Sequence, residues 1–179
     1  MTSKSLLILF SYHHHNTERI AESFANVLNA PIRGPTQTHP REMQEYDMVG
    51  FGSGIYGGKH HASLLALADR LPRSVGKQAF IFSTCGVPFP PLSGEELHKR
   101  FESSGIDNHL ALRERLRSKG YTIVDEFSCA GLNTNSFLKL FGGLNKGRPS
   151  ADDLSKAVEF AAALRHNMEE SSEYPRNGE

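Results

Sequence analysis

The sequence has few cysteines, no excess of charge of either sign, and no long hydrophobic run. Cys85 and Cys129 are too few for a disulfide scaffold, and we expect both to be reduced. Lys and Arg total 20, as do Asp and Glu, so a net charge of zero disfavours binding to nucleic acid or to a membrane through bulk charge. No apolar run approaches the roughly 20 residues that a membrane span needs.

The N-terminal apolar run, 6–10, ends at Ser11 and lacks a cleavage pattern of small residues, so no signal peptide is predicted. We therefore expect a soluble, cytoplasmic protein. Its 179 residues exceed only slightly the roughly 150 residues of an average domain. This length predicts one domain over 1–165, and the remaining 166–179 read as a polar C-terminal tail that frays.

Short apolar runs alternate with stretches of helical period, a pattern typical of parallel strands covered on both faces. The runs predicted to be strands are 6–10, 46–52, 78–84 and 121–128, with a weak fifth strand near 30–33. The predicted helices are 17–29 behind an Asn16/Thr17 cap, 62–71, 110–119 closed by Gly120, and a helix from the Ser150 cap to about Arg165. This alternation predicts an open, doubly wound α/β sheet with helices on both faces, in which ligands bind beyond the carboxyl ends of the strands.

One connection is much longer than the usual 2–6 residues between a strand and a helix. It follows the 78–84 strand and contains Pro88, Pro90 and Pro91. We interpret 87–107 as an insertion after the fourth strand, and two roles stay open for it. It is either a lid over the site or an interface between two copies of the chain in a homodimer.

The loop after the first strand leads directly into a helix N-terminus, where unpaired N–H groups and the helix dipole favour a phosphate. Neither a P-loop lysine pattern nor a G-x-G-x-x-G fingerprint is present, so a monophosphate is favoured over a triphosphate or dinucleotide. The alternative is that Asn16 or Thr17 is only a helix cap and the histidines form a solvated loop. The candidate phosphate-binding residues are Ser11, His13, His14, His15, Asn16 and Thr17.

Two further loops follow strand ends and suit a flat ligand. Four glycines within 52–58 permit close approach of the backbone, and neighbouring Ile55 and Tyr56 add apolar and aromatic faces. The alternative is a tight turn with Tyr56 packed on the surface. We expect a planar heterocycle between these loops, contacted by Gly54, Ile55, Tyr56, Gly57, Ser83, Thr84, Cys85 and Gly86.

The segments SYHHHNT, GSGIYGGKHH and FSTCG, each following a predicted strand, resemble the flavodoxin-like family. They are most similar to a subgroup whose phosphate loop reads His-His-x-Asn-Thr, and FSCAGLNT and GGLNKGRPSADDL also resemble that subgroup. The resemblance covers most of 4–165. It implies a five-stranded parallel sheet of order 2-1-3-4-5 that binds FMN noncovalently.

The resemblance also implies roles for individual residues. Ser11–Thr17 would hold the ribityl phosphate, although His14 and His15 stand where the common pattern has Thr-Gly. Tyr56 would lie against the isoalloxazine, the Gly57 carbonyl would face flavin N5, and 83–86 would meet the pyrimidine edge.

The predicted function is that of an FMN-binding redox protein, and two roles compete. The neutral charge favours an oxidoreductase acting on a small molecule such as a quinone, with NADH or NADPH as a candidate donor, whereas the resemblance favours an electron carrier between proteins. The electron donor and acceptor stay open. Tyr56, His60 and His61 are the candidate catalytic residues, as proton donors near N5.

Three further hypotheses come from the same residues. The two histidine clusters, 13–15 and 60–61, follow strand ends and would bind a transition metal if they converged. Cys85 and Cys129 follow neighbouring strands and would form a dithiol near the ring, although burial as two small residues is the expected alternative. A binding module without FMN is also compatible with the fold.

Overall fold

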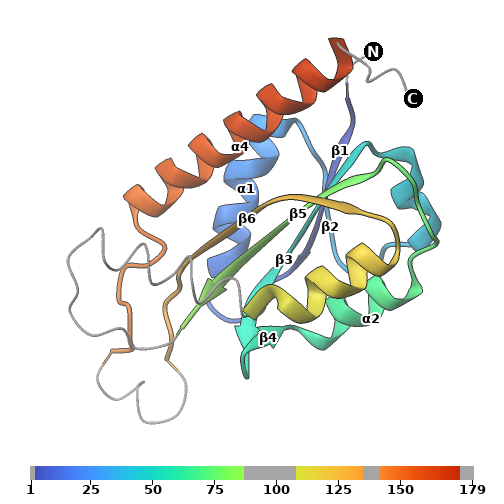
Figure 1. Cartoon of the computed structure of the whole chain (residues 1–179). Helices are drawn as coiled ribbons and strands as arrows, with labels where there is room; N and C mark the ends of the chain where they lie inside the picture. Colours follow the sequence, from blue (N-terminus) through green and yellow to red (C-terminus); the bar gives the residue numbers. More distant parts are fainter. Residues whose placement is uncertain (1–2, 87–107, 135–141, 174–179) are drawn as a thin grey trace.

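The computed structural model describes residues 3–86, 108–134 and 142–173 of the chain (Figure 1). The strands lie at the predicted places, including the short one near residue 32. The strands are β1 (Ser5–Phe10), β2 (Ile32–Arg33), β3 (Met48–Tyr56), β4 (Lys59–His60), β5 (Gln78–Cys85) and β6 (Thr122–Ala130). The helices are α1 (Asn16–Leu28), the 3-10 helix η1 (Pro40–Glu45), α2 (Ala62–Arg70), helix 108–118 and α4 (Ala151–Glu173).

Five strands form a parallel sheet in the order β2-β1-β3-β5-β6, and β4 adds to the end of β3 as an antiparallel partner. When the five parallel strands are numbered in chain order without β4, this is the predicted order 2-1-3-4-5. Helices α1 and α4 cover one face, and α2 and helix 108–118 cover the other (Figure 1). The predicted fold class is therefore confirmed. The predicted insertion, 87–107, lies outside the described residues. Within the described part of the chain, no helix is both long and apolar enough to cross a membrane.

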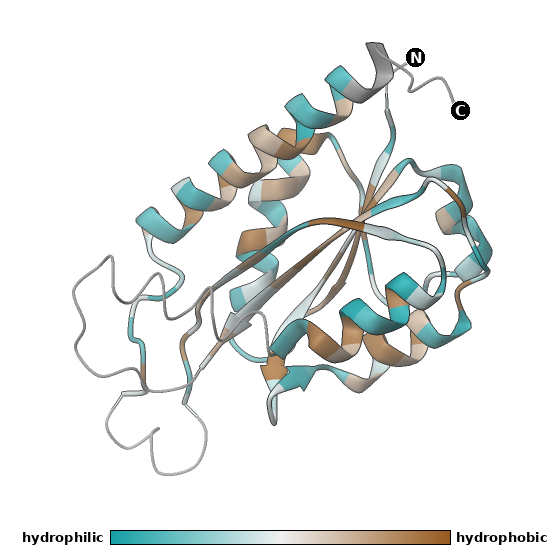
Figure 2. Ribbon diagram, in the orientation of Figure 1, coloured by the Kyte–Doolittle hydropathy of each residue, from teal (hydrophilic) through white to brown (hydrophobic). Residues whose placement is uncertain are grey.

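The two faces of the sheet bury separate apolar cores, and the central strands are largely brown, that is hydrophobic, in Figure 2. On the α1–α4 face, Phe24 lies edge-on to Phe80, Phe82 and Phe127, with ring centroids 5.1–5.6 Å apart. The strand glycines of β3 make room for this cluster. A Cβ atom built on Gly52 would lie 2.1 Å from the Phe82 ring, so this glycine is required by packing.

Strand β3 is longer than predicted and corrects our interpretation of 52–61 as a loop. It continues to Tyr56, turns through Gly57 and Gly58, and returns as β4. Both turn glycines have positive φ (57° and 77°), as a two-residue hairpin turn of type I′ requires. The glycines of 52–58 therefore serve two purposes. Gly52 and Gly54 lie in strand β3, whereas Gly57 and Gly58 form the turn.

Helix α4 also differs from the prediction, because it continues past Arg165 to Glu173. The predicted fraying from residue 166 is wrong over 166–173, and 174–179 lie outside the described residues. The reason is a continued apolar stripe: Leu164 and Met168, four residues apart, are both buried in the α1–α4 core. The Met168 sulfur also accepts a hydrogen bond from Ser5 Oγ at 3.8 Å.

Candidate functional site

A pocket of about 80 Å³ lies beyond the carboxyl ends of the strands, where the order of the sheet reverses between β1 and β3. In open α/β sheets this is the place where ligands bind. Segments at the carboxyl ends of β1, β3 and β5 meet there, which the sequence also predicts. The lining residues are His13, His14, Asn16, Gly54, Ile55, Tyr56, Thr84, Gly86, Gly131, Leu132, Asn133 and Thr134.

The loop from β1 to α1 enters the helix through two histidines in the left-handed conformation. His14 has φ 57° and His15 has φ 53°, which costs a residue other than glycine roughly 1–2 kcal/mol each. His15 is the N-cap, and its side chain makes no capping hydrogen bond but pairs with Glu18 in solvent. The predicted Asn16/Thr17 cap is therefore wrong, and no side-chain cap competes for the N–H groups of the first turn.

Asn16 and Thr17 instead connect α1 to the loop after β6 and to β5. Asn16 Nδ2 donates to the Leu132 carbonyl at 2.8 Å, and the Thr17 hydroxyl lies 2.8 Å from that of Thr84. His14 Nε2 is 2.7 Å from the Thr134 hydroxyl. These contacts hold the loop rigidly over the sheet. Among the described residues, the other pocket histidine, His13, makes a ring contact with Tyr12 at 4.8 Å between centroids.

Residues 131–134, which follow β6, line the pocket but are absent from the predicted set. A Cβ atom on Gly131 would lie 2.8 Å from Asn16 Nδ2, so the two segments are in direct contact. The rule that ligands bind beyond strand ends pointed to this loop too, since β6 is a predicted strand. Gly86, which lines the pocket, is the last residue before the predicted insertion, 87–107.

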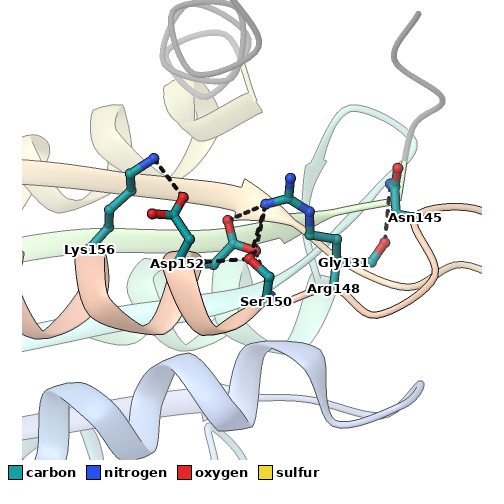
Figure 3. A network of polar contacts seen from close by, with 7 residues as sticks. Gly131, Asn145, Arg148, Ser150, Asp152 and Lys156 are labelled. Carbon is teal, nitrogen blue, oxygen red and sulfur yellow. Dashed lines mark hydrogen bonds and ion pairs between the residues drawn. The ribbon is translucent and has the colours of Figure 1, made fainter. Parts of the chain in front are cut away.

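The segment that returns from this loop to α4 is braced by polar contacts, shown in Figure 3. Asn145 Nδ2 donates to the Gly131 carbonyl at 3.3 Å, which ties the return segment to the pocket wall. Ser150 and Asp153 form reciprocal hydrogen bonds between side chain and backbone, so the predicted Ser150 cap is confirmed. Arg148 Nη1 donates to both Asp153 carboxylate oxygens at 2.7 and 2.8 Å.

At the other side of the pocket, Tyr56 and His61 present aromatic rings at the hairpin. Burial raises the pKa of Tyr56, so its hydroxyl is protonated at neutral pH. His61 is the N-cap of α2, stacks on Phe10 with ring centroids 3.5 Å apart, and meets Tyr56 edge-on at 5.6 Å. Because His61 Nδ1 accepts from the Ser63 N–H, the neutral imidazole carries its proton on Nε2.

Several predicted residues lie away from the pocket lining. His60 and Ser83 are buried on the α2 face, where Ser83 Oγ lies 2.8 Å from His109 Nε2. Cys85 packs beneath the hairpin with Ile55 and Ala130. The remaining predicted residues outside the lining are Ser11, His15, Thr17, Gly57 and His61.

The cysteine geometry contradicts the dithiol hypothesis, and the described residues offer no metal site. Cys85 pairs in register with Ala130, whereas Cys129 pairs with Thr84, so the two thiols point to opposite faces of the sheet. The histidine clusters do not converge, because His60 points into the α2 face while His14 and His15 are exposed at the α1 loop. In the part of the chain that the structure describes, no group of three His, Cys, Asp or Glu side chains is placed to hold a metal ion.

Comparisons with known proteins agree with this architecture. Flavodoxin 2 from Bacillus cereus superposes with a TM-score of 0.63 at 18% identity, over 92% of this chain and 99% of that protein. An NADH:FMN oxidoreductase superposes with a TM-score of 0.55 at 19% identity, over 90% of each chain. No family model matches the sequence.

The fold is thus that of the flavodoxin-like proteins. At the level of sequence, an uncharacterized protein of Methanocaldococcus jannaschii is 44% identical over 164 residues, which cover 92% of this chain and 99% of that protein. The chain belongs to the same family as this archaeal protein.

Proposed function

We propose that this chain is an FMN-binding redox protein, and that it passes electrons through FMN to a small molecule such as a quinone. The observation that carries the proposal is the pocket itself. It joins the helix N-terminus after β1 to the aromatic hairpin after β3, at the point where the strand order reverses. Flavodoxins and an NADH:FMN oxidoreductase share this fold.

The residues present fit FMN in their chemistry. The first-turn N–H groups of α1 face no side-chain cap, and His13 adds a donor beside them, which suits a phosphate. Gly54, Gly86 and Gly131 line the pocket without side chains, so the backbone can approach a flat ring. The pocket of about 80 Å³ is small against the 300–1,000 Å³ of typical ligand sites, so it would hold only part of FMN, with the ring against Tyr56.

When bound, FMN supplies the one- and two-electron chemistry. The chain contributes position and protons. Tyr56 would offer its ring as a stacking face, and the His61 Nε2–H would be the proton donor, because the cap and the stack on Phe10 hold that imidazole in one orientation. The electron-carrier role is the second candidate. The zero net charge supports the oxidoreductase, since a carrier relies on a charged docking surface.

Titration of the purified protein with FMN, riboflavin and FAD tests the binding proposal. We expect FMN to bind at least tenfold more tightly than riboflavin because only FMN carries the phosphate. His13→Ala should weaken FMN several-fold and leave riboflavin unchanged, whereas Tyr56→Leu should weaken both. His166→Ala, at an imidazole 70% exposed on α4, is the matched control and should change neither. Equal affinity for FMN and riboflavin contradicts a phosphate site.

Stopped-flow reduction with NADH and with NADPH separates the two roles. Rapid bleaching of the flavin absorbance supports the oxidoreductase, and its absence with both donors favours a carrier reduced by another protein. Turnover with a soluble quinone, measured in the same instrument, then tests the acceptor.

A further inference from the structure

A row of serines crosses the carboxyl-terminal part of the sheet on the face covered by α2. Ser53, Ser83 and Ser128 are register partners on β3, β5 and β6. Two of them hold buried histidines: Ser53 Oγ lies 2.9 Å from His60 Nδ1, and Ser83 Oγ lies 2.8 Å from His109 Nε2. The imidazoles are 2% and 1% exposed and face each other with ring centroids 4.9 Å apart.

The two histidines differ in how their nitrogens are satisfied. Both nitrogens of His109 are hydrogen-bonded, because Nδ1 lies 2.8 Å from a carboxylate oxygen of Glu126, which in turn accepts from Arg113. His60 Nε2, in contrast, is buried and has no hydrogen-bond partner among the described residues. A buried polar atom without a partner is costly, so this nitrogen calls for an explanation.

The hydrogen bonds of Ser53 indicate one tautomer of His60. The Ser53 hydroxyl donates its one proton to the Gly54 carbonyl at 2.8 Å and accepts from the His61 N–H at 3.0 Å. With the Ser53 proton on the Gly54 carbonyl, we infer that His60 Nδ1 is the donor in its contact with Ser53 Oγ at 2.9 Å. The neutral ring then carries its proton on Nδ1, and the unpartnered Nε2 presents a lone pair.

His60 is not itself a lining residue, but its strand adjoins the pocket wall. His60 is the register partner of Ile55, and Ile55 and Gly54 both line the pocket. We propose that His60 is a proton-accepting residue of the site, whose Nε2 takes up one proton from solvent when negative charge develops on a group bound in the pocket. In this step an Nε2–H bond forms and an O–H bond of a solvent hydronium or water breaks, while the electrons stay on the bound group.

The surroundings keep His60 neutral until such a charge appears. Burial is the main effect that lowers the pKa of His60 well below its usual value, the nearby His109 lowers it further, and Glu126 opposes both. Arg113 is paired with Glu126, and His61 turns its Nδ1 to Ser63. One negative charge about 8 Å away, at an effective dielectric constant of 20, would increase the proton affinity of Nε2 roughly thirtyfold.

Nitrogen-15 NMR of the wild-type imidazoles tests the first step without any variant. We expect His60 to be neutral at pH 7 and to carry its proton on Nδ1, the tautomer that is minor in water. A neutral ring protonated on Nε2, or a ring already charged at pH 7, overturns the proposal.

The second test rests on the proposed function. It measures the protons taken up from a weak buffer when the FMN-loaded protein is reduced with dithionite. Because Asn retains a donor to Ser53 but cannot titrate, His60→Asn should take up fewer protons per FMN than wild type, at the pH where wild-type uptake is largest. His166→Asn should match wild type. Equal proton uptake by wild type and His60→Asn overturns the proposal for His60 but does not affect FMN binding. A wild type that binds no FMN overturns the proposed function, and the NMR result then decides on His60.

Discussion

The hydroxyls of Thr17 and Thr84 lie 2.8 Å apart and join the first turn of α1 to the end of β5. Both side chains are buried, at 2% and 4% exposure. Thr84 lines the pocket, and Thr17 belongs to the loop predicted to hold the phosphate. The two parts of the candidate site are therefore locked to each other by one hydrogen bond before any ligand binds.

We expect Thr84→Val to destabilise the fold by about 1–2 kcal/mol, because it leaves the Thr17 hydroxyl buried without this partner. Thr17→Val/Thr84→Val should recover part of that loss, since both polar groups are then gone. Urea unfolding of the two single variants and the double variant measures the coupling. Strictly additive losses would mean that the contact contributes nothing of its own.

Gly52 on β3 should not tolerate even a methyl group, because the new Cβ would lie 2.1 Å from the Phe82 ring. Overpacking of this kind costs about 1–3 kcal/mol or more, so Gly52→Ala should lower the midpoint of urea unfolding clearly. Gly52→Ala/Phe82→Leu should recover stability. Gly57→Ala is the control, because nothing lies within 4 Å of its Cβ and only its positive φ adds strain of about 1 kcal/mol.

The sheet was predictable because its strands are covered on both faces and so appear as continuous apolar runs, β1 most clearly. The second half of β3 was not predictable. Its glycines leave space for phenylalanine rings, but in the sequence a run of glycines is typical of a loop. Residues 131–134 also come directly after a strand, so the rule that ligands bind beyond strand ends predicts them as pocket residues too. The contacts of His60 and His109 depend on strand register. Ser83 and His109, for example, are 26 residues apart in the sequence, and no local pattern predicts that they meet.

Stability should fall in acid as the buried pair formed by Glu126 and Arg113 is lost. Burial alone would raise the pKa of Glu126, but hydrogen bonds from Arg113 and His109 outweigh it and hold this pKa at about 2, below the usual 4.5. Because the folded pKa is the lower one, the stabilisation is complete above about pH 4.5 and is lost as pH falls toward 2. Its full size is about 3 kcal/mol.

Glu126→Gln should therefore unfold more easily at pH 7 and lose less stability than wild type between pH 4.5 and 2. Chemical unfolding at a series of pH values measures both effects. The exposed pair of Lys156 and Asp152, at 3.0 Å, offers the control, because Asp152→Asn should change stability by less than about 1 kcal/mol. Parallel stability curves for wild type and Glu126→Gln in acid would contradict the assignment.

His15 holds a left-handed conformation that glycine adopts without strain, so His15→Gly should stabilise the protein. The relief of roughly 1–2 kcal/mol is reduced by the greater chain entropy of glycine, which leaves a gain of about 0.5–1 kcal/mol. Asn29→Gly, at φ 48°, is the matched control and should gain less because asparagine already tolerates this region. The His15 side chain is 69% exposed and pairs with Glu18, so FMN affinity should stay within twofold if the backbone of this turn holds the phosphate. A loss of fivefold or more in a fluorescence titration would show instead that the imidazole itself contacts FMN.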